Sequence, residues 1–175
     1  MKKIIFSFIL LFTFSLQVEA QQVRPSQKAS VSQFVANTEI NINYSRPVAR
    51  GRTLFGEEGI IKYDKTWMPG ANEASYIEID TPILVNGEEL DAGKYSIWTV
   101  PNDGQWEIIF STEWDAWHSR YPGEDKDVLR VQATTKEGDH MEVMAFYFPV
   151  VSANTTILNL HWGNTIVQLS LELIE

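Results

Sequence analysis

The sequence predicts an all-β protein: an antiparallel β-sandwich or jelly roll of about nine or ten short strands. Apolar and polar side chains alternate in one segment after another, as they do in strands with one buried face. Turn-forming Gly, Asn and Pro separate these segments, and no apolar run at helical spacing is long enough to cross over a parallel sheet. A closed barrel is the main alternative, because sequence pattern does not count sheets.

The predicted strands follow one another along most of the chain. The alternation is clear at residues 40–44, 77–79, 94–100, 106–110 and 129–133. It is cleanest near the C-terminus, in two runs: one side of the first carries Thr156, Leu158, Leu160 and Trp162, and the second alternates Val167, Leu169, Leu171 and Leu173 with polar residues. Each segment is expected to bury one face against a common core.

Two dipeptides predict hairpin turns. Asn86-Gly87 follows the apolar run 83–85, and both residues tolerate the positive φ of a two-residue turn. Gly163-Asn164 separates the alternating runs 156–162 and 167–173, so a hairpin is expected there too.

One segment departs from the strand pattern. Thr112 to His118 contains a possible capping box, formed by Thr112 and Asp115, and aromatic residues at helical spacing, so at most a short helical turn is expected near 112–118. Residues 21–27 are expected to form a frayed leader.

The N-terminus predicts export. Lys2 and Lys3 precede the apolar run Ile4 to Leu16, and small residues lead to Ala20, as in a signal peptide cleaved near that residue. The run is shorter than the roughly 18 apolar residues of a membrane span, so no span is expected after cleavage. The expected organisation is a signal peptide at 1–20 and a single β-sandwich domain at 21–175, located in the periplasm or secreted.

Composition excludes several classes of function. The 23 acidic and 14 basic side chains give a formal net charge of −9, which disfavours nucleic-acid binding. The absence of cysteine removes disulfides and thiolate sites. The three histidines share no metal-binding spacing, Glu124, Asp125 and Asp127 resemble a solvated turn more than a calcium loop, and no cofactor motif is present, so neither metal nor cofactor is expected.

A loop rich in Gly and Pro carries the first candidate site. Arg46, Arg50 and Arg52 open a stretch that extends to about Gly70. Long loops in compact domains are often functional, and arginines can bind a ligand carboxylate or phosphate. The alternative is internal pairing with Glu57, Glu58 or Glu73.

Asn72 and Glu73 follow this loop, at the start of a predicted strand. A carboxylate beside an amide is suited to acid or base catalysis when burial raises the carboxyl pKa. An Asn-stabilised turn beside an Arg–Glu pair would have the same sequence. No second carboxylate can be assigned to Glu73.

Tryptophans form the other candidate site, since exposed indoles stack on sugar rings. Trp106 and Trp162 are expected in the core from their alternation, whereas Trp98, Trp114 and Trp117 are the better candidates for exposure.

Several motifs are spaced along the chain: Tyr44-Ser45-Arg46-Pro47, Gly51-Arg52-Thr53-Leu54-Phe55-Gly56, Trp67, Gly70-Ala71-Asn72-Glu73-Ala74-Ser75, Ala92-Gly93-Lys94-Tyr95-Ser96 and Thr99-Val100-Pro101. Together they resemble the domain of unknown function 2911 family of exported bacterial proteins, common in the Bacteroidetes. The resemblance implies export and a single domain, with no assigned activity.

The leading hypothesis is a non-catalytic protein that binds a small molecule or glycan. Its candidate ligand-binding residues are Arg46, Arg52, Asn72, Glu73, Trp67, Trp98, Trp117 and His118. One alternative is a hydrolase of envelope or dietary polymers with Glu73 as acid or base. Another is a structural envelope scaffold. No oligomeric state follows from the sequence.

Overall fold

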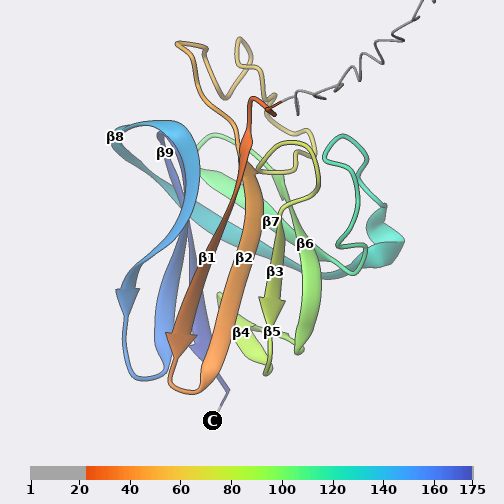
Figure 1. The fold of residues 1–175 in the computed structure, drawn as a ribbon, viewed down its shortest axis with the longest axis vertical. Coiled ribbons are helices and arrows are strands. Elements are labelled where there is room, and N and C mark those ends of the chain that lie inside the picture. The colour runs from red at the N-terminus through yellow and green to blue at the C-terminus, as the bar shows by residue number, and fades with distance from the viewer. Residues whose placement is uncertain (1–22, 175) are drawn as a thin grey trace, which may run out of the picture.

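The computed structural model describes residues 23–174, and these contain nine β-strands and one short 3₁₀ helix (Figure 1). The signal peptide predicted at 1–20 lies outside the described residues. The elements are β1 (Gln27–Val35), β2 (Thr38–Arg46), β3 (Tyr76–Ile79), β4 (Ile83–Val85), β5 (Glu88–Leu90), β6 (Gly93–Val100), β7 (Gln105–Ser111), η1 (Glu124–Lys126), β8 (Asp127–Val151) and β9 (Thr155–Leu173).

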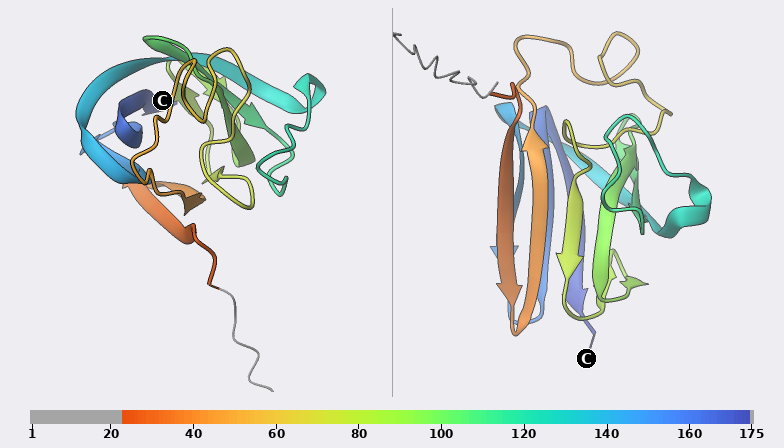
Figure 2. Two further views of the ribbon diagram at one scale, coloured as in Figure 1. Left: turned by 90° about the horizontal axis from the view of Figure 1, so that it is seen from above. Right: turned by 45° about the vertical axis from the view of Figure 1, so that its right-hand side comes forward.

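All nine strands belong to one antiparallel sheet, in the order β1-β2-β3-β6-β7-β8-β9-β4-β5. The long strand β8 links its two parts, because residues 127–134 pair with β7 whereas residues 134–151 pair with β9. In the right-hand view of Figure 2, β1, β2, β3 and β6 lie in front of β8 and β9. The predicted all-β, antiparallel fold is therefore confirmed, with one continuous sheet supplying both layers.

The core lies between these two layers and follows the predicted alternation. On β2, Ile40, Ile42 and Tyr44 face inward, and Ile77 and Ile79 do so on β3. A second, smaller apolar cluster of Met68, Ala74, Trp98 and Ile109 is separate from the main core. It forms where β6 and β7 are covered by the loops before β3 and after β7, so these strands are covered on both faces.

Residues 112–118 form no helical turn, which agrees with the expectation of at most a short one. These residues form bends and turns, and the single helix of the described chain is the 3₁₀ turn η1 at Glu124–Lys126. The Thr112 hydroxyl donates to the carbonyl of Lys126 at 3.2 Å instead of capping a helix. The Thr112 hydroxyl, which suggested a helix cap, therefore links the loop after β7 to η1.

The prediction of a hairpin at Gly163-Asn164 is wrong, whereas the hairpin at Asn86-Gly87 is confirmed between β4 and β5. Gly163 lies inside β9 and has φ +59°, and the register with β8 shifts around its partner Met141. The chain turns between Val151 and Thr155 instead. Gly163 therefore has the positive φ that a hairpin turn would need, but this angle accommodates an irregularity within a long strand.

Candidate binding groove and neighbouring loops

The long segment between β2 and β3, residues 47–75, lies over one end of the curled sheet (Figure 1, orange to yellow). Arg46 fixes its start. The Arg46 Nε donates to the carbonyl of Met144 at 2.9 Å, and Nη2 lies 3.5 Å from the carbonyl of Val143. Both carbonyls belong to β8, so this half-buried arginine joins the end of β2 to β8 and has a structural role.

Arg52 also bonds to backbone, but it remains exposed to solvent. Its Nε donates to the carbonyl of Ala49 at 2.9 Å and its Nη2 to that of Val48 at 2.6 Å. The expected alternative of pairing with Glu57, Glu58 or Glu73 is wrong, because none of Arg46, Arg50 and Arg52 forms an ion pair within residues 23–174.

Two adjoining pockets, of about 340 Å³ and about 290 Å³, form a groove between the 52–63 segment and the bent part of β8 and β9. They share four lining residues, Phe55, Tyr63, Asn164 and Thr165. The larger pocket adds Asn102, Asp103, Gly104, Trp106, Thr135, Lys136 and Glu137, and the smaller adds Arg52, Thr53, Leu54, His140, Trp162 and Gly163. The lining therefore combines aromatic rings with hydroxyl, amide and charged groups, as ligand sites do.

An aromatic cluster supports this groove. Phe55 packs edge-on against Trp106 and Trp162, with ring centroids 4.9 Å and 6.2 Å away. Trp67 stacks on Trp162 at 6.2 Å. Trp106 and Trp162 are buried as predicted, and the half-buried Trp67 packs with them without lining either pocket.

The irregularity at Gly163 lets the loop approach β9. A Cβ at this position would lie 2.8 Å from the Cδ1 atom of Leu54. Leu54 itself is buried in the main core. Glycine is therefore required at position 163 by its positive φ and by the close approach of Leu54. This approach holds the loop against β9 and forms the wall of the groove.

A different site brings Asn72 and Glu73 together with Trp117 and His118. The Asn72 carbonyl accepts from the backbone N–H of His118 at 3.0 Å and from its ring Nδ1 at 2.8 Å, so Nδ1 carries a proton. Glu73 and Trp117 form a β-bridge. Four predicted residues thus lie on two paired loops, at a place that lines neither pocket of the groove.

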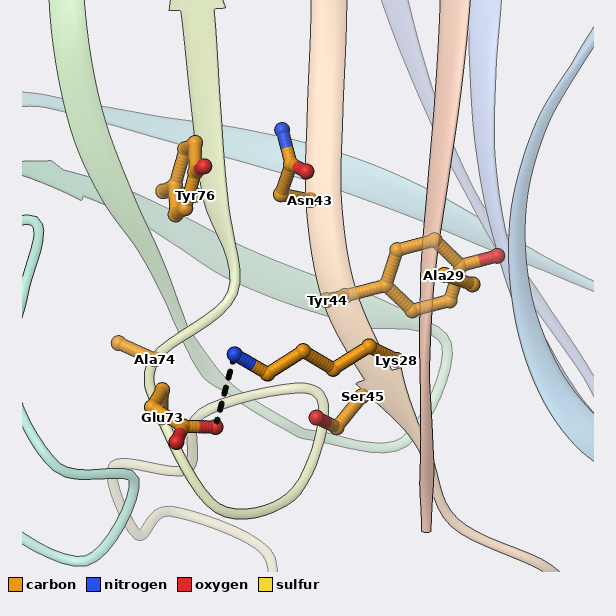
Figure 3. Close-up of a pocket in the computed structure, with 8 residues that line it drawn as sticks. All are labelled: Lys28, Ala29, Asn43, Tyr44, Ser45, Glu73, Ala74 and Tyr76. Atoms are coloured by element: carbon orange, nitrogen blue, oxygen red, sulfur yellow. Dashed lines mark ion pairs between the residues drawn. The ribbon is translucent and has the colours of Figure 1, made fainter.

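Glu73 is held by two cations that precede it in the chain. The Arg24 Nη1 lies 2.6 Å from Oε1 and the Lys28 Nζ lies 3.9 Å from Oε2. Figure 3 shows Lys28 reaching from β1 toward Glu73 across a small pocket of about 100 Å³. The Arg24 hydrogen bond, the Glu73 backbone amide and the nearby positive charges lower the pKa of Glu73, and burial opposes this only in part. The catalytic hypothesis requires a raised carboxyl pKa, whereas the contacts of Glu73 lower it.

The expectation that Trp98 is exposed is wrong. Trp98 is 1 % exposed, its indole Nε1 donates to Oγ of Ser96 at 2.9 Å, and its ring packs on Tyr121. Trp114 and Trp117 are exposed as predicted. The Lys94 ammonium lies over the rings of Trp114 and Tyr76, at 3.9 Å and 4.1 Å, so Trp114 is already engaged by a cation.

The predicted residues therefore do not converge on one site. Arg52 lines the groove, Arg46 and Trp98 are structural, Trp67 supports the groove, and the remaining four lie on the paired loops. Sequence reasoning missed Tyr63 and Thr165, which carry no motif, and it assigned Asn164 to a hairpin turn. It also missed Arg24, because residues 21–27 were expected to be a frayed leader, whereas Arg24 binds Glu73.

The acidic segment near η1 forms an ion-pair network. The Asp127 carboxylate accepts from the Tyr121 hydroxyl and from Arg130, whose Nη2 lies 2.7 Å away, and Arg130 also pairs with Glu107 at 2.8 Å.

No group of three or more acidic or histidine side chains suited to a metal ion occurs in the described part of the chain.

Comparison with known proteins identifies a family whose function is not known. The family model described as a protein of unknown function, DUF2911, matches residues 26–171. The chain belongs to this family. No curated protein matches the chain, and no solved structure does. Among residues 23–174, no helix is long and apolar enough to cross a membrane.

Two of the motifs that suggested the DUF2911 family lie at the two sites, one at each. The motif at 51–56 supplies one wall of the groove, and the motif at 70–75 supplies Asn72 and Glu73. The family itself assigns no role to either position.

Proposed function

We propose that this DUF2911 protein is an exported, non-catalytic protein that binds a small polar ligand in the groove. The observation that carries the proposal is the pair of adjoining pockets, of about 340 Å³ and about 290 Å³, which share Phe55, Tyr63, Asn164 and Thr165. Each volume is within or close to the range of roughly 300–1,000 Å³ typical of ligand sites. The shared residues offer two aromatic faces, two hydroxyls and one amide to a single ligand.

The geometry favours binding over catalysis. Glu73 lines neither pocket, and its two cationic neighbours lower its pKa. A general acid at neutral pH needs the opposite shift. The hydrolase hypothesis with Glu73 as acid or base therefore has less support than ligand binding.

The scaffold hypothesis is supported at one position. Arg46 bonds to two carbonyls of β8, as an arginine that ties a loop down would do. That role is compatible with binding, because a fixed loop gives the groove a rigid wall.

Export rests on the N-terminal sequence. If residues 1–20 are a signal peptide, the full chain expressed in a Gram-negative host should yield a periplasmic or secreted product that begins at Gln21. Mass spectrometry of the product would measure this. A product that retains residues 1–20, or one found with the cytoplasmic fraction, would contradict export.

Binding can be tested by thermal shift with a panel of monosaccharides, sugar acids and small dicarboxylates. We expect at least one compound to raise Tm, and Thr53→Trp to remove that shift by filling the groove at an exposed position. Ser30→Trp, exposed on β1 away from the groove, is the matched control. A panel without any shift, or a shift that survives Thr53→Trp, would contradict binding in the groove.

A further inference from the structure

One end of the groove, the Arg52 pocket, is lined by an arginine and a histidine without any carboxylate. It is the smaller pocket, of about 290 Å³, lined by Arg52, Thr53, Leu54, Phe55, Tyr63, His140, Trp162, Gly163, Asn164 and Thr165. Its charge-bearing groups are Arg52 and His140. Such a lining is unusual for a chain whose formal net charge is −9. It favours a negatively charged group on the ligand.

Arg52 is preorganised for this role. Its Nε and Nη2 atoms donate to the carbonyls of Ala49 and Val48, so the guanidinium plane is fixed against the loop backbone. Neither an ion pair nor a hydrogen bond from Nη1 is formed within the described residues. The positive charge is therefore uncompensated by any acidic side chain there, and an oxyanion can bind it without displacing one.

His140 differs from Arg52, because its Nε2 lies 2.9 Å from the Glu142 carboxylate. Glu142 does not line the pocket. Any charge on His140 is thus balanced locally, and Arg52 is the residue that distinguishes an acidic ligand from a neutral one.

A second observation comes from Trp162, which lines the same pocket. Trp162 is 3 % exposed, and its indole Nε1–H is buried without a hydrogen-bond partner in the described chain. A buried donor without a partner is unfavourable, because the hydrogen bond it made to water is not replaced. The Nε1 atom is closed to solvent, so the pocket is lined by the indole ring of Trp162 together with the hydroxyl-bearing residues Thr53, Tyr63 and Thr165.

The neighbouring pocket has a different character. It contains both Lys136 and the acidic residues Asp103 and Glu137, together with amides, hydroxyls and the faces of Phe55 and Tyr63. Mixed donors and acceptors beside aromatic faces suit a neutral polyhydroxylated ring. The two pockets are contiguous, so one ligand can reach both.

We infer that the groove binds an acidic monosaccharide, with its carboxylate in the Arg52 pocket and its hydroxylated ring toward Lys136 and Glu137. This rests on the proposed function, because it names the ligand class of the same groove. The carboxylate would accept hydrogen bonds from Arg52, and the ring hydroxyls would bond to the mixed groups of the larger pocket.

Matched sugar pairs test the inference by titration calorimetry: D-glucuronate against D-glucose, and D-galacturonate against D-galactose. We expect the acidic member of at least one pair to bind with a Kd at least about tenfold lower than its neutral partner. Arg52→Gln should reduce that preference to about twofold or less. Arg50→Gln is the control, because it removes the same charge from the same loop, and the Arg50 side chain forms no ion pair in the described chain.

The outcomes separate the two proposals. Equal or tighter binding of the neutral sugars, blocked by Thr53→Trp, would overturn the acidic-ligand inference and keep the groove as a binding site. A preference lost equally in Arg50→Gln and Arg52→Gln would also overturn it, because the effect would then be long-range. If no sugar binds and the wider panel gives no shift, both proposals fail. Unchanged circular dichroism and Tm in both variants show that the fold is intact.

Discussion

The Nη1 atom of Arg24 lies 2.6 Å from Oε1 of Glu73, although 49 positions separate the two residues in sequence. This ion pair connects the segment before β1 to the loop before β3. Lys28 adds a longer contact to the other oxygen of Glu73, at 3.9 Å. Both cations favour the ionised carboxylate, so the folded state lowers the pKa of Glu73 from its ordinary value of 4.5.

Glu73→Gln should lower the free energy of unfolding at neutral pH by no more than about 1 kcal/mol, because both partners are about half exposed and solvent screens the pair. A carboxyl whose pKa is lowered by folding stabilises the protein above its unfolded pKa, and that contribution disappears as pH falls through the folded pKa. The difference between wild type and variant should therefore vanish in acid. Urea unfolding between about pH 7 and about pH 3 measures it.

Glu58→Gln is the matched control, since Glu58 is exposed and forms no ion pair within the described chain. It should change stability little at any pH. A Glu73→Gln loss that persists unchanged at the acidic end would show that the ion pair does not stabilise the fold.

Trp98→Ala should lower the free energy of unfolding by about 3–5 kcal/mol, the range for removing a fully buried aromatic ring. Trp117→Ala should change it by only about 0.5 kcal/mol, because the Trp117 side chain is about half exposed. Chemical denaturation of the two variants compares them directly. Similar losses in both would mean that the loops after β7 do not cover Trp98.

Strand positions could be predicted from sequence because alternation is a local property. Ile40, Ile42 and Tyr44 face the core as expected, and the period also places Trp98 on the opposite face of β6 from Tyr95 and Ile97. That outer face is buried by Met68 and Ala74 from a distant loop. No local pattern shows where a loop will pack, so the exposure of Trp98 could not be predicted.

The candidate site was only partly predictable for the same reason. Composition indicates the loop from Arg46 to about Gly70, yet its arginines bond to the backbone of β8 and of the loop itself. The groove depends on Asn164 and Thr165, which lie within β9 although the sequence predicts a turn at Gly163-Asn164. Their position follows from the irregularity at Gly163, whose dipeptide with Asn164 is also typical of a hairpin turn.

Gly163→Ala should destabilise the protein more than Gly51→Ala. Both glycines have positive φ, at +59° and +66°, so alanine is strained at either position by roughly 1 kcal/mol. Only at Gly163 would the new methyl group meet a neighbour, the Cδ1 atom of Leu54 at 2.8 Å, whereas nothing lies within 4 Å at Gly51. Denaturant midpoints of the two variants measure the difference.

A double-mutant cycle with Leu54→Ala isolates this contact. Removing the Leu54 side chain relieves the clash, so the combined loss should be smaller than the sum of the single losses. Strict additivity would mean that Leu54 does not pack against Gly163.

Tyr121 should ionise only well above the ordinary range for tyrosine. Burial, and then the hydrogen bond to Asp127, raise the pKa of Tyr121 from 10.0 to about 12, because losing the proton would leave two adjacent anions. A group whose pKa is raised by folding stabilises the protein fully below its unfolded pKa, and this contribution is lost as pH rises from 10.0 toward 12.

The ultraviolet absorbance of tyrosinate measures the ionisation, with Tyr121→Phe for comparison. While circular dichroism stays native, wild type and Tyr121→Phe should show the same number of ionised tyrosines just above pH 10, because Tyr121 is still protonated. One extra tyrosinate in the wild type at that pH would show that the hydroxyl is not held by Asp127.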